Sequence, residues 1–65
     1  MFSYFNVNVS QADTLSKDAP METETYTVHA QSESEAKRKA QAIASARDYE
    51  VKRFNWIQPA KSFAG

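Results

Sequence analysis

Residues 27–40, TVHAQSESEAKRKA, contain the end of one structural element and the start of another. Apolar and polar side chains alternate up to Ala30, which is the period of a strand with one buried face. Ser32 is followed three residues later by Glu35, and this spacing is that of a capping box, in which the two side chains bond free backbone amides at the start of a helix. The stretch therefore predicts a strand that ends near Ala30 and a helix that begins after Ser32.

The predicted helix has a narrow apolar stripe. Ala36, Ala40, Ile43 and Ala44 recur at helical spacing, and polar residues surround them. Glutamates lie in the first turn and cations follow, as the helix dipole favours. Because alanine is small, we expect this helix to lie close against a sheet.

Three segments have the alternation of a strand: residues 2–10, 23–31 and 47–58. Pro59 is expected to end the last one, because proline cannot continue the hydrogen-bonded ladder. Between the first two lies a polar stretch without a period, predicted to be a loop over residues 10–22. The side chains expected beneath the helix are Val7, Val9, Tyr26, Val28, Ala30, Tyr49 and Val51.

The order of these segments predicts a single α+β domain over residues 1–65, with the pattern β-β-α-β. The strand, helix and strand over residues 23–58 form a crossover unit, and we expect the first strand to lie between the two others, antiparallel to both. One helix would then pack on one face of a three-stranded sheet. A break of the last strand near residues 52–55 would instead give a bent, four-stranded sheet, and residues 59–65 are predicted to be a tail.

Several kinds of chemistry lack the residues they need. The chain has no cysteine, one histidine and one terminal glycine, which argues against a thiolate site, a metal site, a glycine-rich phosphate loop and an enzyme. We therefore expect no catalytic residue, no cofactor and no metal. No apolar run or signal sequence is present, so the interpretation is a cytoplasmic protein with no membrane partner.

Charge is distributed unevenly along the chain. Residues 1–35 carry one lysine against six acidic residues, while residues 36–65 carry seven cations against two acidic residues. Such asymmetry is typical of proteins that contact nucleic acid or an oppositely charged protein. The alternative is that the opposite charges meet within the fold.

Residues 51–58, VKRFNWIQ, raise the question of which face of the sheet the last aromatics occupy. In a strand without a bulge, Phe54 and Trp56 would point away from the helix, near Tyr4 and the cations Lys52 and Arg53. These five residues would form an aromatic surface for single-stranded nucleic acid or for a protein, including a second copy in a homodimer. A β-bulge around Lys52 and Arg53 would instead turn Phe54 and Trp56 into the core.

The segment TVHAQSESEAKRKA resembles the corresponding segment of a small phage-encoded anti-CRISPR family that inhibits type I-F surveillance complexes. The resemblance implies a phage or mobile-element protein that acts in the host cytoplasm. Its partner would be a host protein or ribonucleoprotein complex that handles nucleic acid, with direct nucleic-acid contact as one route. The basic pair of that family corresponds by position to Lys37 and Arg38.

The helix cations agree with this implication. Lys37, Arg38, Lys39 and Arg47 are predicted to be partner-binding residues on an exposed face of the helix. The leading hypothesis is therefore a non-enzymatic inhibitor that blocks a host complex through this basic surface. The alternatives are a small nucleic-acid-binding module that uses the sheet aromatics, a structural homodimer, or a helix face that is merely solvated.

Overall fold

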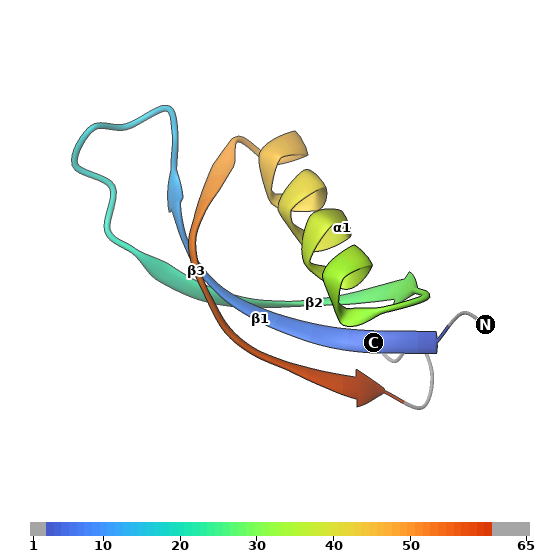
Figure 1. Ribbon diagram of the computed structural model, residues 1–65. Coiled ribbons are helices and arrows are strands. Elements are labelled where there is room, and N and C mark those ends of the chain that lie inside the picture. Colours follow the sequence, from blue (N-terminus) through green and yellow to red (C-terminus); the bar gives the residue numbers. More distant parts are fainter. Residues whose placement is uncertain (1–2, 61–65) are drawn as a thin grey trace.

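The structure is a computed structural model that describes residues 3–60. It contains β1 (Ser3–Asp13), β2 (Glu22–Ala30), α1 (Glu33–Ala46) and β3 (Tyr49–Ala60). The sheet has the order β2-β1-β3, and β1 is antiparallel to both neighbours. The helix packs on one face, and the sheet curves around it (Figure 1). The predicted α+β fold with a central first strand is confirmed, and the three-stranded form is the one observed.

The helix begins at the predicted place. The Ser32 side chain accepts a hydrogen bond from the backbone N–H of Glu35 at 3.2 Å, and the Glu35 carboxylate accepts one from the backbone N–H of Gln31 at 2.6 Å. The two side chains thus satisfy amides around the first turn, although the second amide is that of Gln31 rather than of Ser32. At the other end, Asp48 has a φ of 65° and turns the chain into β3.

The core lies between α1 and the sheet. Three alanines of the predicted stripe are fully buried, whereas Ile43 remains 39% exposed at the flank of the helix. The buried apolar residues are Val7, Val9, Tyr26, Val28, Ala30, Ala36, Ala40 and Ala44. Partly buried side chains that pack against them are Phe5, Tyr49, Val51, Phe54 and Ile57. All seven side chains expected beneath the helix belong to these two sets.

The first and the last predicted strands are longer in the structure. β1 continues to Asp13, because Gln11 is fully buried and its side-chain carbonyl accepts a hydrogen bond from the Tyr26 hydroxyl at 2.7 Å. The connection to β2 therefore covers residues 14–21. β3 includes Pro59, which is tolerated because β3 is an edge strand. Residues 61–65 of the predicted tail lie outside the described residues.

The pairing of β1 with β2 differs from its pairing with β3. The β1–β2 ladder runs without a shift from Ser3 opposite Ala30 to Gln11 opposite Glu22. The β1–β3 ladder shifts twice: Lys52 and Asn55 have no partner residue on β1. Each shift is a β-bulge, and each reverses the alternation of side chains along β3.

These two bulges decide where the aromatic side chains of β3 lie. The bulge at Lys52 turns Phe54 toward the core, where it pairs with Val9. The bulge at Asn55 turns the next residue back, so that Trp56 pairs with Asn8 and is 43% exposed. A bulge near residue 52 is therefore confirmed and buries Phe54 in part, but the prediction that it also buries Trp56 is wrong because of the second bulge.

Candidate functional site

The candidate site is the face of the sheet that α1 does not cover, here called the open face (Figure 1). Its side chains follow from the registers of the two ladders. They are Tyr4, Asn6, Asn8, Ser10, Ala12, Thr23, Thr25, Thr27, His29, Glu50, Arg53, Asn55, Trp56, Gln58 and Ala60. Amides and hydroxyls dominate this set, and its one carboxylate, that of Glu50, is paired with Lys52.

A row of hydrogen-bonded side chains crosses the open face. Asn8 donates from its amide to the Thr25 hydroxyl at 2.9 Å, and Asn55 donates to the Asn8 carbonyl oxygen at 2.9 Å. Asn55 also donates to the Ser10 hydroxyl at 3.0 Å. The row joins all three strands, and its two β1 members are buried by their neighbours. Because each side chain is held by another, the row presents a fixed surface.

Asn55 is the centre of this row because it is the bulge residue. The bulge leaves it unpaired on the ladder while its side chain reaches Asn8 and Ser10. Its carbonyl oxygen accepts a hydrogen bond from Arg53 Nε at 3.1 Å. The bulge therefore also ties a guanidinium to the open face.

Two aromatic groups lie beside the polar row: Trp56 follows Asn55 directly, and the Tyr4–His29 pair lies farther along the sheet, toward the start of β1. Tyr4 and His29 stack with their ring centres 4.6 Å apart and their planes 21° from parallel. Trp56 lies opposite Asn8, four residues along β1 from Tyr4. At about 3.3 Å per residue, this places the Tyr4–His29 pair and Trp56 roughly 13 Å apart along the strand.

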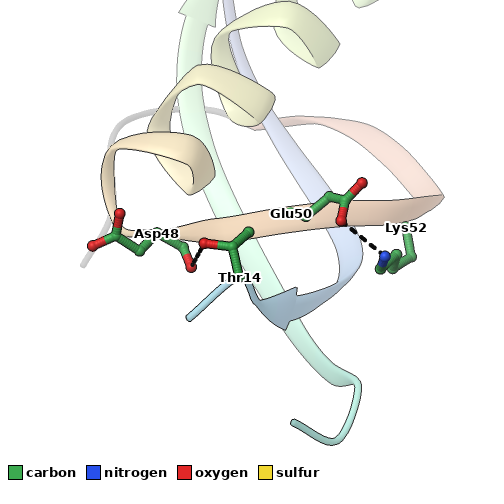
Figure 2. Close-up of polar contacts among 4 residues, drawn as sticks. All are labelled: Thr14, Asp48, Glu50 and Lys52. Carbon is green, nitrogen blue, oxygen red and sulfur yellow. Dashed lines mark hydrogen bonds and ion pairs between the residues drawn. The ribbon is translucent and has the colours of Figure 1, made fainter. Parts of the chain in front are cut away.

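Lys52 and Phe54, two members of the predicted aromatic surface, do not contribute as expected. The Lys52 ammonium forms an ion pair with Glu50 at 2.9 Å near the start of β3 (Figure 2). Phe54 belongs to the helix side of the sheet, because the first bulge reverses the alternation. Tyr4, Arg53 and Trp56 are the members that the structure places on the open face.

The three consecutive helix cations point in different directions. Lys37 lies on the β3 side of α1, with its ammonium 5.7 Å from the centre of the Phe54 ring. Lys39 lies on the β2 side and donates a hydrogen bond to the backbone carbonyl of His29. Arg38 is exposed between them. The structure therefore spreads these residues around α1 instead of gathering them into one patch.

Arg47, the fourth predicted partner-binding residue, is engaged within the fold. It follows the last turn of α1, and its guanidinium donates to the Tyr26 hydroxyl at 2.9 Å. The same group lies 5.7 Å from the centre of the Tyr26 ring and 5.3 Å from that of Tyr49. Arg47 thus holds the C-terminal end of the helix against β2 and β3, away from Lys37 and Arg38.

A polar cluster surrounds Arg47 at this end of the molecule. The Glu22 carboxylate raises the pKa of the Tyr49 hydroxyl most, partial burial and Asp13 raise it further, and Arg47 opposes them. The turn beside this cluster is fixed by Thr14, whose hydroxyl donates to the backbone carbonyl of Asp48 at 3.0 Å (Figure 2). This cluster joins the ends of β1, β2 and β3.

The sequence prediction gave no role to Asn8, Ser10 and Asn55, three of the four members of the polar row. Asn8 and Ser10 could have been found, because they alternate with buried valines and Thr25 and Thr27 do the same on β2. Asn55 could not, because its role depends on a bulge that no local pattern specifies. Gln11 was placed in the loop, since nothing in its neighbours shows that the Tyr26 hydroxyl requires a buried partner.

Comparison of the chain with family models, with curated proteins and with solved structures finds no match. Among residues 3–60, no group of three or more histidine, aspartate and glutamate side chains could hold a metal ion. Within the same residues, the helix is too short and too polar to cross a membrane.

Proposed function

We propose that the protein is a non-enzymatic, cytoplasmic binding module that takes single-stranded nucleic acid on the open face. One observation supports this proposal above others: a row of hydrogen-bonded amides and hydroxyls lies beside Trp56, and the Tyr4–His29 stack lies farther along the same sheet face, which α1 does not cover. Unpaired bases offer a flat ring for stacking and polar edges for hydrogen bonds. On the open face, the aromatic side chains offer rings for stacking, and the amides and hydroxyls offer partners for the polar edges.

Charge on the open face also suits a nucleic acid. Arg53 is the cation beside the polar row. The nearest acidic side chain on this side of β3, that of Glu50, is paired with Lys52. A phosphate backbone could therefore approach Arg53 without strong repulsion from the face itself.

The proposal is tested by titration with labelled single-stranded oligonucleotides. Trp56 is the only tryptophan of the chain, so its fluorescence reports contact at the open face directly. We expect quenching of this fluorescence, and an affinity that falls as salt rises because cations are released from the nucleic acid. No quenching and no change in anisotropy at low salt and high protein concentration would contradict the proposal.

Two variant pairs locate the binding surface. Trp56→Ala should lower the affinity by about 1–3 kcal/mol, the usual value for loss of one stacked base. Leu15→Ala, which removes a 78% exposed apolar side chain from the 14–21 connection, is its control and should leave affinity unchanged. Arg53→Gln should reduce the salt dependence, whereas Lys52→Gln should reduce it less because Lys52 is already paired with Glu50.

The outer surface of α1 gives a second candidate function. Lys37 and Arg38 are adjacent and exposed near the start of the helix, and the anti-CRISPR resemblance assigns this pair to the blocking of a host complex. A phage or mobile-element protein of this kind would bind that complex without free nucleic acid. Lys37→Glu combined with Arg38→Glu should then abolish capture of the complex from bacterial lysate, while Trp56→Ala should not; retained capture by the double variant would refute this surface.

A further inference from the structure

We propose that a second copy of this chain pairs with the outer edge of β2, giving a two-fold symmetric dimer with one continuous six-stranded sheet. The pairing strand is β2 of the second copy, antiparallel to the first. This inference concerns a different surface from the open face and does not depend on nucleic-acid binding.

The two edges of the sheet differ in their ability to accept another strand. Natural sheets protect an edge with bulges, charged side chains and proline, because such features prevent pairing with other chains. β3 has all three: bulges at Lys52 and Asn55, the cations Lys52 and Arg53, and Pro59. The β3 edge is therefore poorly suited to accept a strand.

The β2 edge has few of these protective features. Its residues, Glu22–Ala30, form an uninterrupted ladder with β1 and contain no proline, lysine or arginine. Threonine, tyrosine and valine, which favour strands, occupy its centre. The backbone groups of β2 that do not face β1 thus form a regular edge.

A groove follows this edge on the helix side. It has a volume of about 440 Å³ and is lined by Thr27, Val28, His29, Lys39, Ala42 and Ile43. Ile43 is the exposed member of the apolar stripe, at 39% of its surface. A strand added to β2 would direct alternate side chains into this groove and cover Ile43.

The side chains of β2 itself complement this groove. In a pairing centred on Tyr26, each Thr25 lies opposite Thr27 of the other copy, and each Glu24 lies opposite the other Val28. Glu24 is opposite Val9 on β1, so its side chain is on the helix side, where the groove contains Lys39. In the symmetric dimer, the Glu24 carboxylate of each copy lies beside the Lys39 ammonium of the other. This charge complementarity favours a second copy as the occupant of the groove.

The proposed dimer is closed. After pairing, its sheet ends on both sides with β3, whose bulges and proline oppose further growth. The two-fold axis is perpendicular to the sheet, so both helices lie on one side and both open faces on the other. A dimer would therefore join the two open faces into one surface, twice as wide as the open face of a single chain.

Sedimentation or light scattering over a dilution series tests the proposal. We expect a concentration-dependent dimer for the unaltered chain. Ile43→Glu should weaken it at least a hundredfold, since it replaces the apolar side chain that the added strand would cover with a charged one, which would also compete with Glu24 of the other copy for Lys39. Gln41→Glu adds the same charge on the opposite flank of α1, beside β3, and should leave the dissociation constant unchanged. A monomer at all concentrations, or equal effects of the two variants, would overturn the proposal.

A charge exchange tests the pairing itself. Glu24→Lys and Lys39→Glu should each weaken the dimer roughly tenfold, by turning attraction into repulsion at two symmetric positions. The double variant should recover most of the loss. Circular dichroism of each variant establishes that the monomer is folded, and single variants that are folded and associate normally would overturn the assigned pairing. Absence of recovery in a folded double variant would do the same.

Discussion

The two ladders formed by β1 have different consequences for the two faces of the sheet. On the β2 side the register never shifts, so alternate residues go strictly to the core or to the open face. On the β3 side two bulges let a single strand supply Phe54 and Ile57 to the core and Asn55 and Trp56 to the open face. The regular ladder between β1 and β2 thus forms the framework of the sheet, whereas the bulges of β3 place Asn55 and Trp56 on the open face.

The largest expected effect on stability separates Phe54 from Trp56, the two aromatic residues that follow the first bulge of β3. Phe54→Ala should lower the free energy of unfolding by about 2 kcal/mol, less than for a fully buried phenylalanine, because Phe54 is only partly buried. Trp56→Ala should lower it by less than about 1 kcal/mol, since Trp56 is 43% exposed. Urea denaturation measures both. Equal losses would show that the second bulge does not separate these side chains.

The next effect concerns the loss of stability when the polar row loses its member on β3 or its member on β2. Asn55→Ala should cost about 1.5 kcal/mol of stability, because it removes hydrogen-bond partners from both Asn8 and Ser10. Thr25→Val keeps the shape of its side chain and removes one partner of Asn8, so it should cost about 1 kcal/mol. A larger loss for Thr25→Val than for Asn55→Ala would contradict the central position of the bulge residue.

A smaller effect concerns the turn that leads into the bulged ladder. Asp48→Gly should raise the free energy of unfolding by about 0.5 kcal/mol, because glycine adopts a φ of 65° without steric cost. The bonds from Thr14 use the backbone carbonyl of residue 48 and should persist. Asp18→Gly in the 14–21 connection is the control: φ of Asp18 is not positive, so this change should stabilise nothing. Thermal denaturation distinguishes the two.

The smallest effect is a pH dependence where the two ladders meet. The pKa of Tyr49 is raised above 10.0, mainly by Glu22, so the folded protein holds this proton more tightly than the unfolded chain. The resulting stability is complete below pH 10 and is lost as pH rises through the folded pKa. Tyr49→Phe should make the fall in melting temperature between about pH 9 and pH 11 shallower. Glu22→Gln should do the same, and an unchanged slope in both would contradict the assigned cause.

The sequence was sufficient for the features that depend on local periodicity. The alternation in β1 and β2 identified the buried valines, and Ser32 with Glu35 identified the start of the helix. The geometry of a helix also argues against a single patch formed by the three consecutive cations. Consecutive residues are about 100° apart around a helix, so Lys37, Arg38 and Lys39 could not share one face.

The bulges could not be placed from the sequence alone. VKRFNWIQ permits a straight strand, one bulge or two, because aromatic and polar residues both tolerate partial exposure. What selects two bulges is the pairing with β1, where Val9 accepts Phe54 and Asn8 accepts Trp56. These contacts join residues more than forty positions apart, and no local pattern reports them.

The central place of β1 also sets an order of assembly. β1 and β2 are separated only by residues 14–21, so they can form a hairpin early. Tyr4 meets Ala60 only after the helix and nearly all of β3 have been synthesised. Until then the buried side chains of β1 lack one neighbouring strand, and contacts this distant in sequence form slowly. We therefore expect β3 to dock last during folding and to detach first in partial unfolding, taking Trp56 and Asn55 with it.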